Sequence, residues 1–499
     1  MRSAFIRDSN WRTLAILSII GLIVMYIETM VAPAIPDFIK DFAIPYNTAP
    51  WILTAYLVVA VVMTPIMARL SDMYGRKNIL LSGLVIYAFA TLAAGFATSI
   101  YFMVIARSIQ GIGLSVFPIA VAIIRNQSSD QRLGFNQGII TSMFATGAVI
   151  GLAAGGTIVH FFGWRATFFT VLPVLILLII LLKRCIRDKF KLNFGSSNDY
   201  NDRSTNGIED SNVHSKIDLK GAIVFSIGIT SFLLMITNLN SQTTYSNLVV
   251  IGSFAAIGII CSLIFYYIEK GTKSPLIDLR LVKDGILLAA NVLRLMSGLF
   301  MFAILNTMPI LIRSPKPIGF GESAVNTASV ILPFMAAYLI VGLSFGYIMS
   351  RIGNTKVTLI GSMVSVLGFT TLVFFFHSEF VVLISLGVLG AGFQLLHQGS
   401  ININLVSTPK RQTGISFGIS NVFYLVGGAM GPAIVGMYMQ ENQISTKGIA
   451  GSFPSSDSYI LIFSTGIVLS IISIIVDIVA MDKIAKKRKN ASTFGTEFA

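Results

Sequence analysis

Three polar residues interrupt two long apolar segments of the chain. "YIETMVAPAIP" places Glu28 in the first segment, and "ARSIQGIG" places Arg107 and Gln110 in the fourth. If both segments are membrane helices, a rise of 1.5 Å per residue sets Glu28 and Arg107 at similar depths, roughly 9–12 Å below one surface. A charge inside a bilayer costs ~2.5–3.5 kcal/mol. We therefore expect an ion pair, direct or through Gln110, that either couples to a proton on Glu28 or only holds two helices together.

A second polar group lies later in the chain. Arg294 falls near the middle of an apolar segment, and "QLLHQ" brings His397 into another. An unperturbed histidine titrates near neutral pH, so His397 either carries a proton or hydrogen-bonds two helices. With nearby aromatic residues, these side chains could line a central substrate cavity. The predicted lining is Tyr26, Tyr56, Gln110, Phe117, Phe144, Asn291, Arg294, Gln394, His397 and Tyr424.

Fourteen mainly apolar segments must position these side chains. The 499 residues are 54% hydrophobic and only 12% charged, against about 25% charged residues in soluble proteins. A spanning helix needs roughly 20 apolar residues. We predict an all-α polytopic membrane protein, in which the first segment is a retained helix and a porin-like barrel is excluded. The approximate spans are 13–36, 47–70, 79–98, 101–124, 135–160, 166–183, 218–239, 247–268, 285–312, 322–350, 356–376, 379–406, 413–438 and 458–481.

The positive charge of the chain is distributed unevenly between the loops. The net charge is +14, and Arg107 and Arg294 lie inside apolar segments. This asymmetry follows the positive-inside rule and predicts both termini in the cytoplasm of a multi-pass cell-membrane protein. The placement of positive residues in cytoplasmic loops beside the lipid bilayer accounts for the net charge, so no nucleic-acid partner is expected. The loops on the external side hold only Lys40, Arg165, Arg313, Lys316 and Lys447.

Glycine spacing relates the two ends of the chain to each other. An ordered series of glycines repeats at an offset of 278 to 280 residues, which predicts two parallel six-helix halves with a site between them. The matched pairs are Gly75 with Gly353, Gly111 with Gly390, Gly113 with Gly392, Gly147 with Gly427, and Gly151 with Gly431. We expect an N-terminal six-helix bundle (1–183), a cytoplasmic linker (184–217), two additional transmembrane helices (218–268), a C-terminal six-helix bundle (269–482) and a cytoplasmic tail (483–499).

Two short motifs are dense in glycine and charge. "ARLSDMYGRK" joins two segments by a short loop, where Asp72, Gly75, Arg76 and Lys77 form a charged tight turn or a simple cytoplasmic anchor. "GAVIGLAAGG" sets Gly147, Gly151 and Gly155, followed by Gly156, on a helix that another backbone can approach closely. This pattern is also compatible with packing alone.

Enzymatic chemistry is not expected. The chain lacks a G-x-x-x-x-G-K-[ST] phosphate loop and an H-E-x-x-H cluster, so neither a built-in ATPase nor a metalloprotease is indicated. Cys185 and Cys261 suggest no disulfide framework and no metal site. Asp477 lies close to the cytoplasmic end of the last segment and is expected to point to the membrane surface. We predict no cofactor and no metal.

These motifs resemble the major facilitator superfamily and, within it, the fourteen-helix drug:proton antiporters. "ARLSDMYGRK", "RSIQGIG" and "GAVIGLAAGG" are similar to the family's loop 2–3, helix 4 and helix 5 motifs. The resemblance implies two bundles that alternate access, a cytoplasmic latch containing Asp72 and Arg76, and a proton-coupling role for Arg107. Two departures stand out. Glu28 falls one residue after the branch's usual helix 1 aspartate, and Leu152 replaces the proline of the helix 5 antiporter motif.

We therefore expect a monomeric secondary active transporter that exports amphipathic, cationic or neutral, drugs or toxic compounds in exchange for protons. The first alternative is a major facilitator transporter of a specific metabolite, such as an organic anion, a sugar or a siderophore, with Arg294 as a carboxylate clamp. The second is a sensor or scaffold that binds a partner through the polar segment 193–216 or the basic tail. Drug flux that ignores a proton gradient would contradict the first expectation.

Overall fold

The computed structural model describes residues 10–127, 130–185, 218–239, 245–272, 284–408, 413–445 and 452–493. These residues are almost entirely helical because the long apolar segments satisfy their backbone groups internally. The helices of the first part are α1 (Asn10–Thr29), η1 (Ala32–Ala34), α2 (Ile35–Asp41), α3 (Trp51–Tyr74), α4 (Arg76–Gly95), α5 (Ile100–Leu114), α6 (Phe117–Gln127), α7 (Asp130–Phe162) and α8 (Trp164–Cys185).

The later elements continue the same pattern. They are α9 (Leu219–Asn238), α10 (Tyr245–Gly271), α12 (Gly285–Arg313), α13 (Ala324–Ile352), α14 (Asn354–Phe375), α15 (Glu379–Ser407), α16 (Thr413–Glu441), β1 (Gln443–Ser445), β2 (Ser452–Pro454) and α17 (Ser456–Thr493). The two short strands pair in antiparallel register, with Ile444 opposite Phe453. The predicted linker lies outside the described residues from residue 186 onward.

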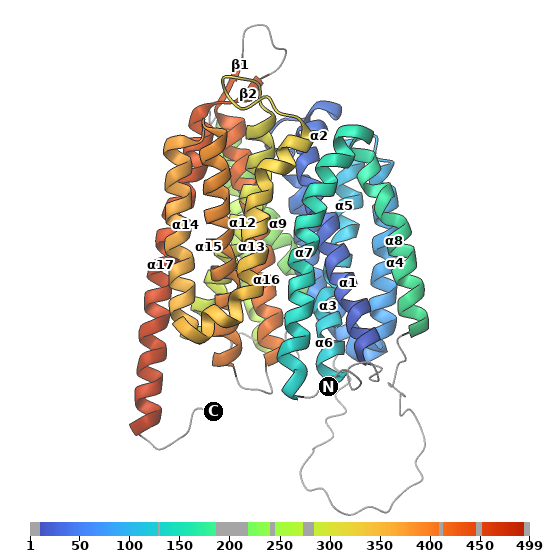
Figure 1. Cartoon of the computed structure of the whole chain (residues 1–499), viewed down its shortest axis with the longest axis vertical. Helices are drawn as coiled ribbons and strands as arrows, with labels where there is room; N and C mark the ends of the chain where they lie inside the picture. Colours follow the sequence, from blue (N-terminus) through green and yellow to red (C-terminus); the bar gives the residue numbers. More distant parts are fainter. Residues whose placement is uncertain are drawn as a thin grey trace, which may run out of the picture.

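The number of spanning helices agrees with the sequence prediction. Thirteen helices among the described residues are long and apolar enough to cross a membrane, and α7 contributes the shorter apolar stretch Thr146–Phe162. We call the face where α1 begins and α17 ends the terminal face, and the opposite face, with β1 and β2, the hairpin face (Figure 1). The prediction of a fourteen-helix, all-α membrane protein is confirmed.

Three segments differ locally from their predicted spans. The first ends early, since α1 stops at Thr29 and the proline-containing η1 and α2 follow, where Pro33 and Pro36 have no N–H to continue an α-helix. The fourth is divided, because α5 ends at Leu114 and α6 begins at Phe117. The last runs on as α17 to Thr493, so most of the expected tail is helical.

The helices form an N-terminal bundle (α1 to α8) and a C-terminal bundle (α12 to α17), which stand side by side in Figure 1. Within the first, α1 packs on α7, α3 on α5, and α4 on α8; within the second, α12 packs on α16, α13 on α15, and α14 on α17. The bundles meet where α7 packs on α13 and α3 on α16. The additional pair α9 and α10 packs on itself, and α9 also contacts α16 and α3.

The glycine repeat of the sequence corresponds to repeated backbone contacts. A side chain at Gly147 would collide with the carbonyl of Leu22 on α1, and one at Gly427 with that of Leu295 on α12. In the same way, Gly111 lies against Tyr56 of α3, and its counterpart Gly390 lies against Phe334 of α13. Each glycine therefore permits the same helix pair to pack closely in both bundles.

The predicted tight turn at Gly75 and its counterpart in the repeat, Gly353, share one backbone conformation. Gly75 between α3 and α4 has φ 91° and ψ 131°, and Gly353 between α13 and α14 has φ 91° and ψ 154°. The backbone of any residue with a Cβ atom is strained in this region of φ/ψ space. Glycine is therefore required at both reversals, as their matching positions in the sequence indicated.

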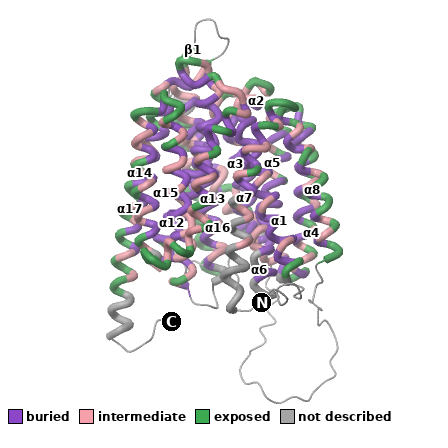
Figure 2. Tube along the Cα trace, viewed as in Figure 1, coloured by how far each residue is buried: buried purple, intermediate pink, exposed green. Residues whose placement is uncertain are grey.

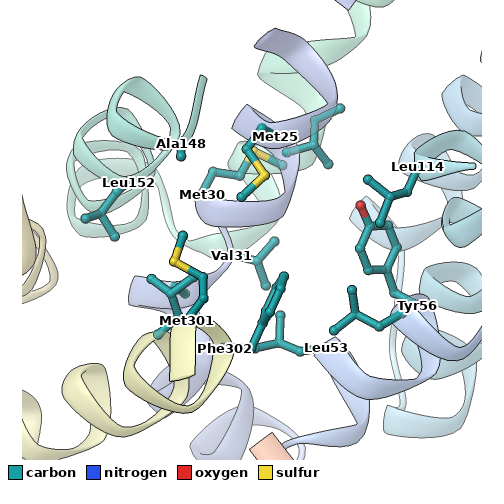
Figure 3. Packing of buried hydrophobic residues seen from close by; sticks show 14 of the residues in the cluster. Met25, Met30, Val31, Leu53, Tyr56, Leu114, Ala148, Leu152, Met301 and Phe302 are labelled. Atoms are coloured by element: carbon teal, nitrogen blue, oxygen red, sulfur yellow. The ribbon is translucent and has the colours of Figure 1, made fainter. Parts of the chain in front are cut away.

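Buried residues concentrate where helices meet, and exposed residues lie on the outside of the bundle (Figure 2). Many of the exposed residues are large and apolar. The main core runs across both bundles: Val31 and Leu53 of the first share it with Met301 and Phe302 of the second (Figure 3). Helix α10 is the least covered, with 6% of its most apolar window buried. An apolar outer surface is what a lipid environment favours.

Candidate functional site

Glu28 and Arg107 form an ion pair inside the N-terminal bundle. Arg107 Nη2 on α5 lies 3.4 Å from Glu28 Oε2 on α1, and both side chains are almost completely buried. The predicted proximity of the two charges is therefore present and direct. The length of 3.4 Å exceeds the 2.7–2.9 Å usual for a charge-assisted hydrogen bond, which makes this a loose pair.

Arg107 is held in place by other groups besides Glu28. Its Nε donates to the carbonyl of Ile52 at 3.1 Å, and its Nη1 donates to Gln110 Oε1 at 2.9 Å. The guanidinium also lies 4.5 Å above the ring of Tyr56. Gln110 in turn donates to Thr91 Oγ1 at 2.8 Å. Groups other than Glu28 therefore also hold the arginine in position.

Glu28 also interacts with the buried hydroxyl of Tyr56, while its Oε1 makes no hydrogen bond of normal geometry among the described residues. The residue borders a small cavity between the two bundles, with a volume of about 60 Å³ for water-sized molecules. Glu28 is therefore a buried ionisable group in the wall of this cavity.

The cavity is lined from both bundles by aromatic and polar side chains. On the N-terminal side, the rings of Phe117 and Phe144 stand 4.7 Å apart. On the C-terminal side, Tyr424 occupies the position that matches Phe144 in the repeat. The complete lining is Met25, Glu28, Leu114, Phe117, Phe144, Arg294, Phe302, Tyr338, Gln394, His397, Gln398, Ile401, Phe417, Asn421, Tyr424 and Leu425.

Arg294 is the centre of the polar group on the C-terminal side. Its Nη1 lies 2.6 Å from the ring nitrogens of His397, and its guanidinium lies 4.4 Å above the ring of Tyr424. Because an arginine has donors only, the contacting ring nitrogen must accept, so the imidazole is neutral in this arrangement. His397 therefore serves here as a hydrogen-bond acceptor between α12 and α15.

The structure places six of the ten predicted cavity residues in the lining: Phe117, Phe144, Arg294, Gln394, His397 and Tyr424. The other four have different positions. Tyr56 and Gln110 contact Arg107, Asn291 accepts a hydrogen bond from Asn404 at 3.0 Å, and the backbone of Tyr26 packs against Gly151. Depth along a helix could be read from the sequence, whereas the direction around each helix could not.

Several lining residues were not predicted. Tyr338 lies with its ring 6.0 Å from that of His397, and Phe302 packs 6.2 Å from Tyr424. Asn421 precedes Tyr424 by one turn of α16, and this i, i+3 spacing on a helix already known to face the cavity was a signal that could have identified it. Tyr338 and Phe302 offered no comparable signal among many aromatic residues.

The bundles are joined tightly at the hairpin face. Arg313 at the end of α12 forms an ion pair of 2.6 Å with Asp37 of α2, and it also donates to the carbonyl of Pro33 at 3.2 Å. Tyr46 donates to the carbonyl of Ser452 at 3.3 Å, and Gly156 of α7 packs directly on Ala328 of α13. The cavity is consequently closed toward the hairpin face by contacts between the bundles.

The glycines of "GAVIGLAAGG" divide between two partners. Gly147 and Gly151 face the backbone of α1 and Gly155 that of Met30 directly after it, so another backbone approaches this face as the spacing predicted, while Gly156 faces Ala328 of the other bundle. Leu152, which stands where the resembling motif has proline, is fully buried in the same helix (Figure 3). This motif therefore packs α7 against α1 and against the C-terminal bundle at once.

The charged loop and Asp477 show different outcomes. Gly75 makes the turn between α3 and α4. Lys77, at the start of α4, donates from its Nζ to the carbonyl of Lys183 at 3.1 Å. The side chain of Asp72 lies outside the described residues. Asp477 was expected at the membrane surface, but it is buried and accepts a hydrogen bond from Ser362 at 2.8 Å. That expectation is wrong because α14 covers this face of α17.

Curated relatives of the chain are membrane transporters. The "Multidrug transporter protein MdtP" of Bacillus subtilis is 25% identical over 82% of this chain and 72% of its own length. The "Multidrug resistance protein Stp" of Mycobacterium tuberculosis is 25% identical over 84% and 74%. The "Multidrug efflux pump LfrA" of Mycolicibacterium smegmatis is 25% identical over 85% and 80%.

A solved structure shares the fold. The xylose transporter XylE from E. coli, in a partially occluded inward-open conformation, aligns with a TM-score of 0.60 over 93% of this chain and 96% of its own. The sequence identity is 11%, so this similarity concerns the fold alone. The family model described as "Major Facilitator Superfamily" matches residues 17–432. The chain is therefore a non-enzymatic membrane transporter and belongs to the Major Facilitator Superfamily.

Proposed function

We propose that this protein is a proton-coupled exporter of amphipathic compounds that works by alternating access. The observation that carries the proposal is the state of Glu28. One of its oxygens is loosely paired with Arg107 at 3.4 Å, and the other makes no hydrogen bond of normal geometry in the wall of the cavity, close to the hydroxyl of Tyr56. An intramembrane carboxylate of this kind is a default candidate for proton transfer.

The orientation in the cell membrane follows from charge. Lysines and arginines concentrate in the loops of the terminal face, which the positive-inside rule assigns to the cytoplasm. The hairpin face, closed by Arg313 and Asp37, is then external. In this orientation the described conformation faces inward, and its cavity receives compounds from the cytoplasm or the inner leaflet.

Coupling arises because the protein changes its facing state in only two forms, either with a compound bound and Glu28 ionised or with the cavity empty and Glu28 protonated. In the inward-facing state Glu28 releases its proton to the cytoplasm and a compound binds in the cavity. In the outward-facing state the compound leaves and a proton from outside neutralises Glu28. Ile52 and Gln110 hold Arg107 in position independently of Glu28. In the outward-facing state, Asp72 and Arg76 would latch the cytoplasmic side.

The relatives support export and the class of compound. Three of them carry names that specify multidrug transport, resistance or efflux. The membrane potential supplies the energy: one charge crossing 100 mV is worth ~2.3 kcal/mol. At about 1.4 kcal/mol per tenfold ratio, one proton sustains roughly a 40–50-fold gradient of a neutral compound. No nucleotide is required.

Transport into proteoliposomes with an imposed pH gradient tests this proposal. We expect gradient-driven accumulation of an amphipathic dye by the wild type, and a loss of at least about tenfold in Glu28→Gln. The matched control is Glu379→Gln, which removes an exposed carboxylate at the start of α15 and should transport normally. Flux that is indifferent to the pH gradient, with Glu28→Gln as active as the wild type, would exclude proton coupling through this residue.

A further inference from the structure

We propose that the cavity recognises its compounds through an anionic group bound by Arg294, so that the preferred substrates are amphipathic organic acids. This inference rests on the proposed export function, because it assigns the chemical class of compound to the same cavity. It departs from the leading sequence-based expectation of cationic or neutral compounds and keeps the role of carboxylate clamp that the first alternative gave to Arg294. The argument begins with the charges that the cavity contains.

The cavity has one uncompensated positive charge. Glu28 and Arg294 are the charged residues of its lining. The charge of Glu28 is offset by Arg107, its partner in the N-terminal bundle. Within the described part of the chain, no carboxylate lies within 4.0 Å of Arg294. A buried cation without a counter-ion is costly, and an anionic ligand would remove that cost.

Arg294 has donors to spare for such a ligand. The Nη1 atom of Arg294 contacts His397, whereas its Nε has no partner among the described groups. The residue is buried, with 4% of its surface exposed. The ring of Tyr424 covers one face of the guanidinium plane. A planar guanidinium matches the two oxygens of a carboxylate, so its remaining N–H groups can bind one in bidentate fashion.

The apolar part of the compound has a separate place. Phe117 and Phe144 offer a pair of aromatic rings from the opposite bundle, and Phe302 continues the apolar wall. Glu28 lies near the end of α1 and Arg294 in the first part of α12, so the two groups line the cavity at different depths. The ion pair of Glu28 with Arg107 offsets its charge and reduces its repulsion of an acid bound at Arg294.

A cationic compound would meet the opposite situation. Its charge would lie beside Arg294, which has no acceptor and no neutralising partner, so the repulsion would add to the cost of removing both groups from water. Neutral compounds would bind through the aromatic wall alone and leave Arg294 unsatisfied. The order of affinity expected from the cavity is therefore acid, then neutral compound, then cation.

Equilibrium binding in the absence of any gradient tests this order. We would reconstitute the full chain in phosphatidylcholine nanodiscs, whose lipid carries no net charge, and measure saturable binding of radiolabelled 1-naphthaleneacetate and 1-pyrenebutyrate. Displacement by the methyl esters and by 1-naphthylethylamine gives the relative affinities. We expect the acids to bind at least about tenfold more tightly than the esters, and the amine to bind most weakly.

Variants of Arg294 assign the preference to this residue. Arg294→Gln should abolish the preference for acid over ester while leaving ester binding within about twofold, and Arg294→Lys should retain part of it. The control is Arg351→Gln, which changes an exposed arginine that stacks on Tyr347 and should bind as the wild type does. The wild-type comparison of acid, ester and amine remains decisive if Arg294→Gln does not fold.

Three results would overturn the inference: no saturable binding of either acid to the wild type, tighter binding of the amine, or an unchanged preference in folded Arg294→Gln. Failure of the proposed export function is distinguishable, because binding here needs no proton gradient. Acid binding without gradient-driven flux would contradict the export function alone. Gradient-driven flux of an amine with no preference for acids would contradict the anion site alone.

Discussion

Arg313 and Asp37 join the two bundles through two parallel contacts, Nη1 to Oδ2 at 2.6 Å and Nη2 to Oδ1 at 2.7 Å. Such a fork-to-fork arrangement is the strongest geometry available to an arginine and a carboxylate. It spans α12 and α2 at the hairpin face, on the closed side of the cavity. Any motion that opens this face must break the pair.

Asp37→Asn is therefore expected to favour opening of the hairpin face. Both side chains are about a quarter exposed, so the pair contributes only ~0.2–1 kcal/mol, and the ratio of closed to open molecules should fall by roughly 1.4–5-fold. Distances between spin labels at Lys40→Cys and Asp457→Cys, with Cys185 and Cys261 replaced by serine, would measure this ratio.

The control for that experiment is Asp482→Asn, which breaks the exposed ion pair of Asp482 with Lys486 on α17. This pair joins residues of one helix, so its loss should leave the label distances unchanged. An unchanged distance distribution in Asp37→Asn as well would mean that apolar contacts between the bundles, and not this ion pair, close the face.

The two partners of the buried ion pair should differ in their effect on stability. Arg107→Leu leaves Glu28, Gln110 and the Ile52 carbonyl without their donor, and we expect a loss of about 3–5 kcal/mol. Glu28→Gln retains an amide oxygen for Arg107 and should cost less, about 1–2 kcal/mol. Thermal unfolding of the purified variants compares them, and equal losses would contradict the independent anchoring of Arg107.

Close packing of α7 on α1 makes Gly151 sensitive to a single added methyl group. In Gly151→Ala, the new carbon would collide with the backbone of Tyr26, and we expect a destabilisation of about 1–3 kcal/mol. The matched control is Gly346→Ala in α13, where the carbon meets nothing within 4 Å. That change should be neutral or stabilising by up to about 1 kcal/mol. Similar melting temperatures of the two variants would argue against backbone contact at Gly151.

The turn at Gly353 isolates the cost of backbone conformation. A side chain there would meet no atom within 4 Å, yet φ is 91° and ψ is 154°. We expect both Gly353→Ala and Gly353→Asn to cost about 1–3 kcal/mol of stability, because essentially only glycine adopts these φ and ψ values. Asparagine tolerates the left-handed helical region, but Gly353 lies outside that region. Denaturation midpoints would check this, and rescue by asparagine would show that the turn relaxes into the left-handed region.

Much of the fold could be predicted because membrane helices are specified locally. Length and hydropathy identify a span, since the bilayer leaves a backbone few alternatives to the helix. Charge in the loops predicts orientation, and glycine spacing revealed the repeat that Gly75 and Gly353 confirm by their shared φ of 91°. The rise per residue of a helix also predicted equal depths for Glu28 and Arg107, and in the structure Arg107 Nη2 lies 3.4 Å from Glu28 Oε2.

The tertiary structure decided what rise along a helix leaves open, namely the direction in which each side chain points around its axis. Tyr56 proved to be a platform for Arg107, whereas Tyr338 proved to line the cavity. The pair of Arg313 with Asp37 joins residues 276 positions apart and depends on how the two bundles dock. The sequence thus determined the helices and their depths, because these follow from local composition. Only packing between distant helices determined the rotation of each helix, and with it the charge that a bound compound would meet.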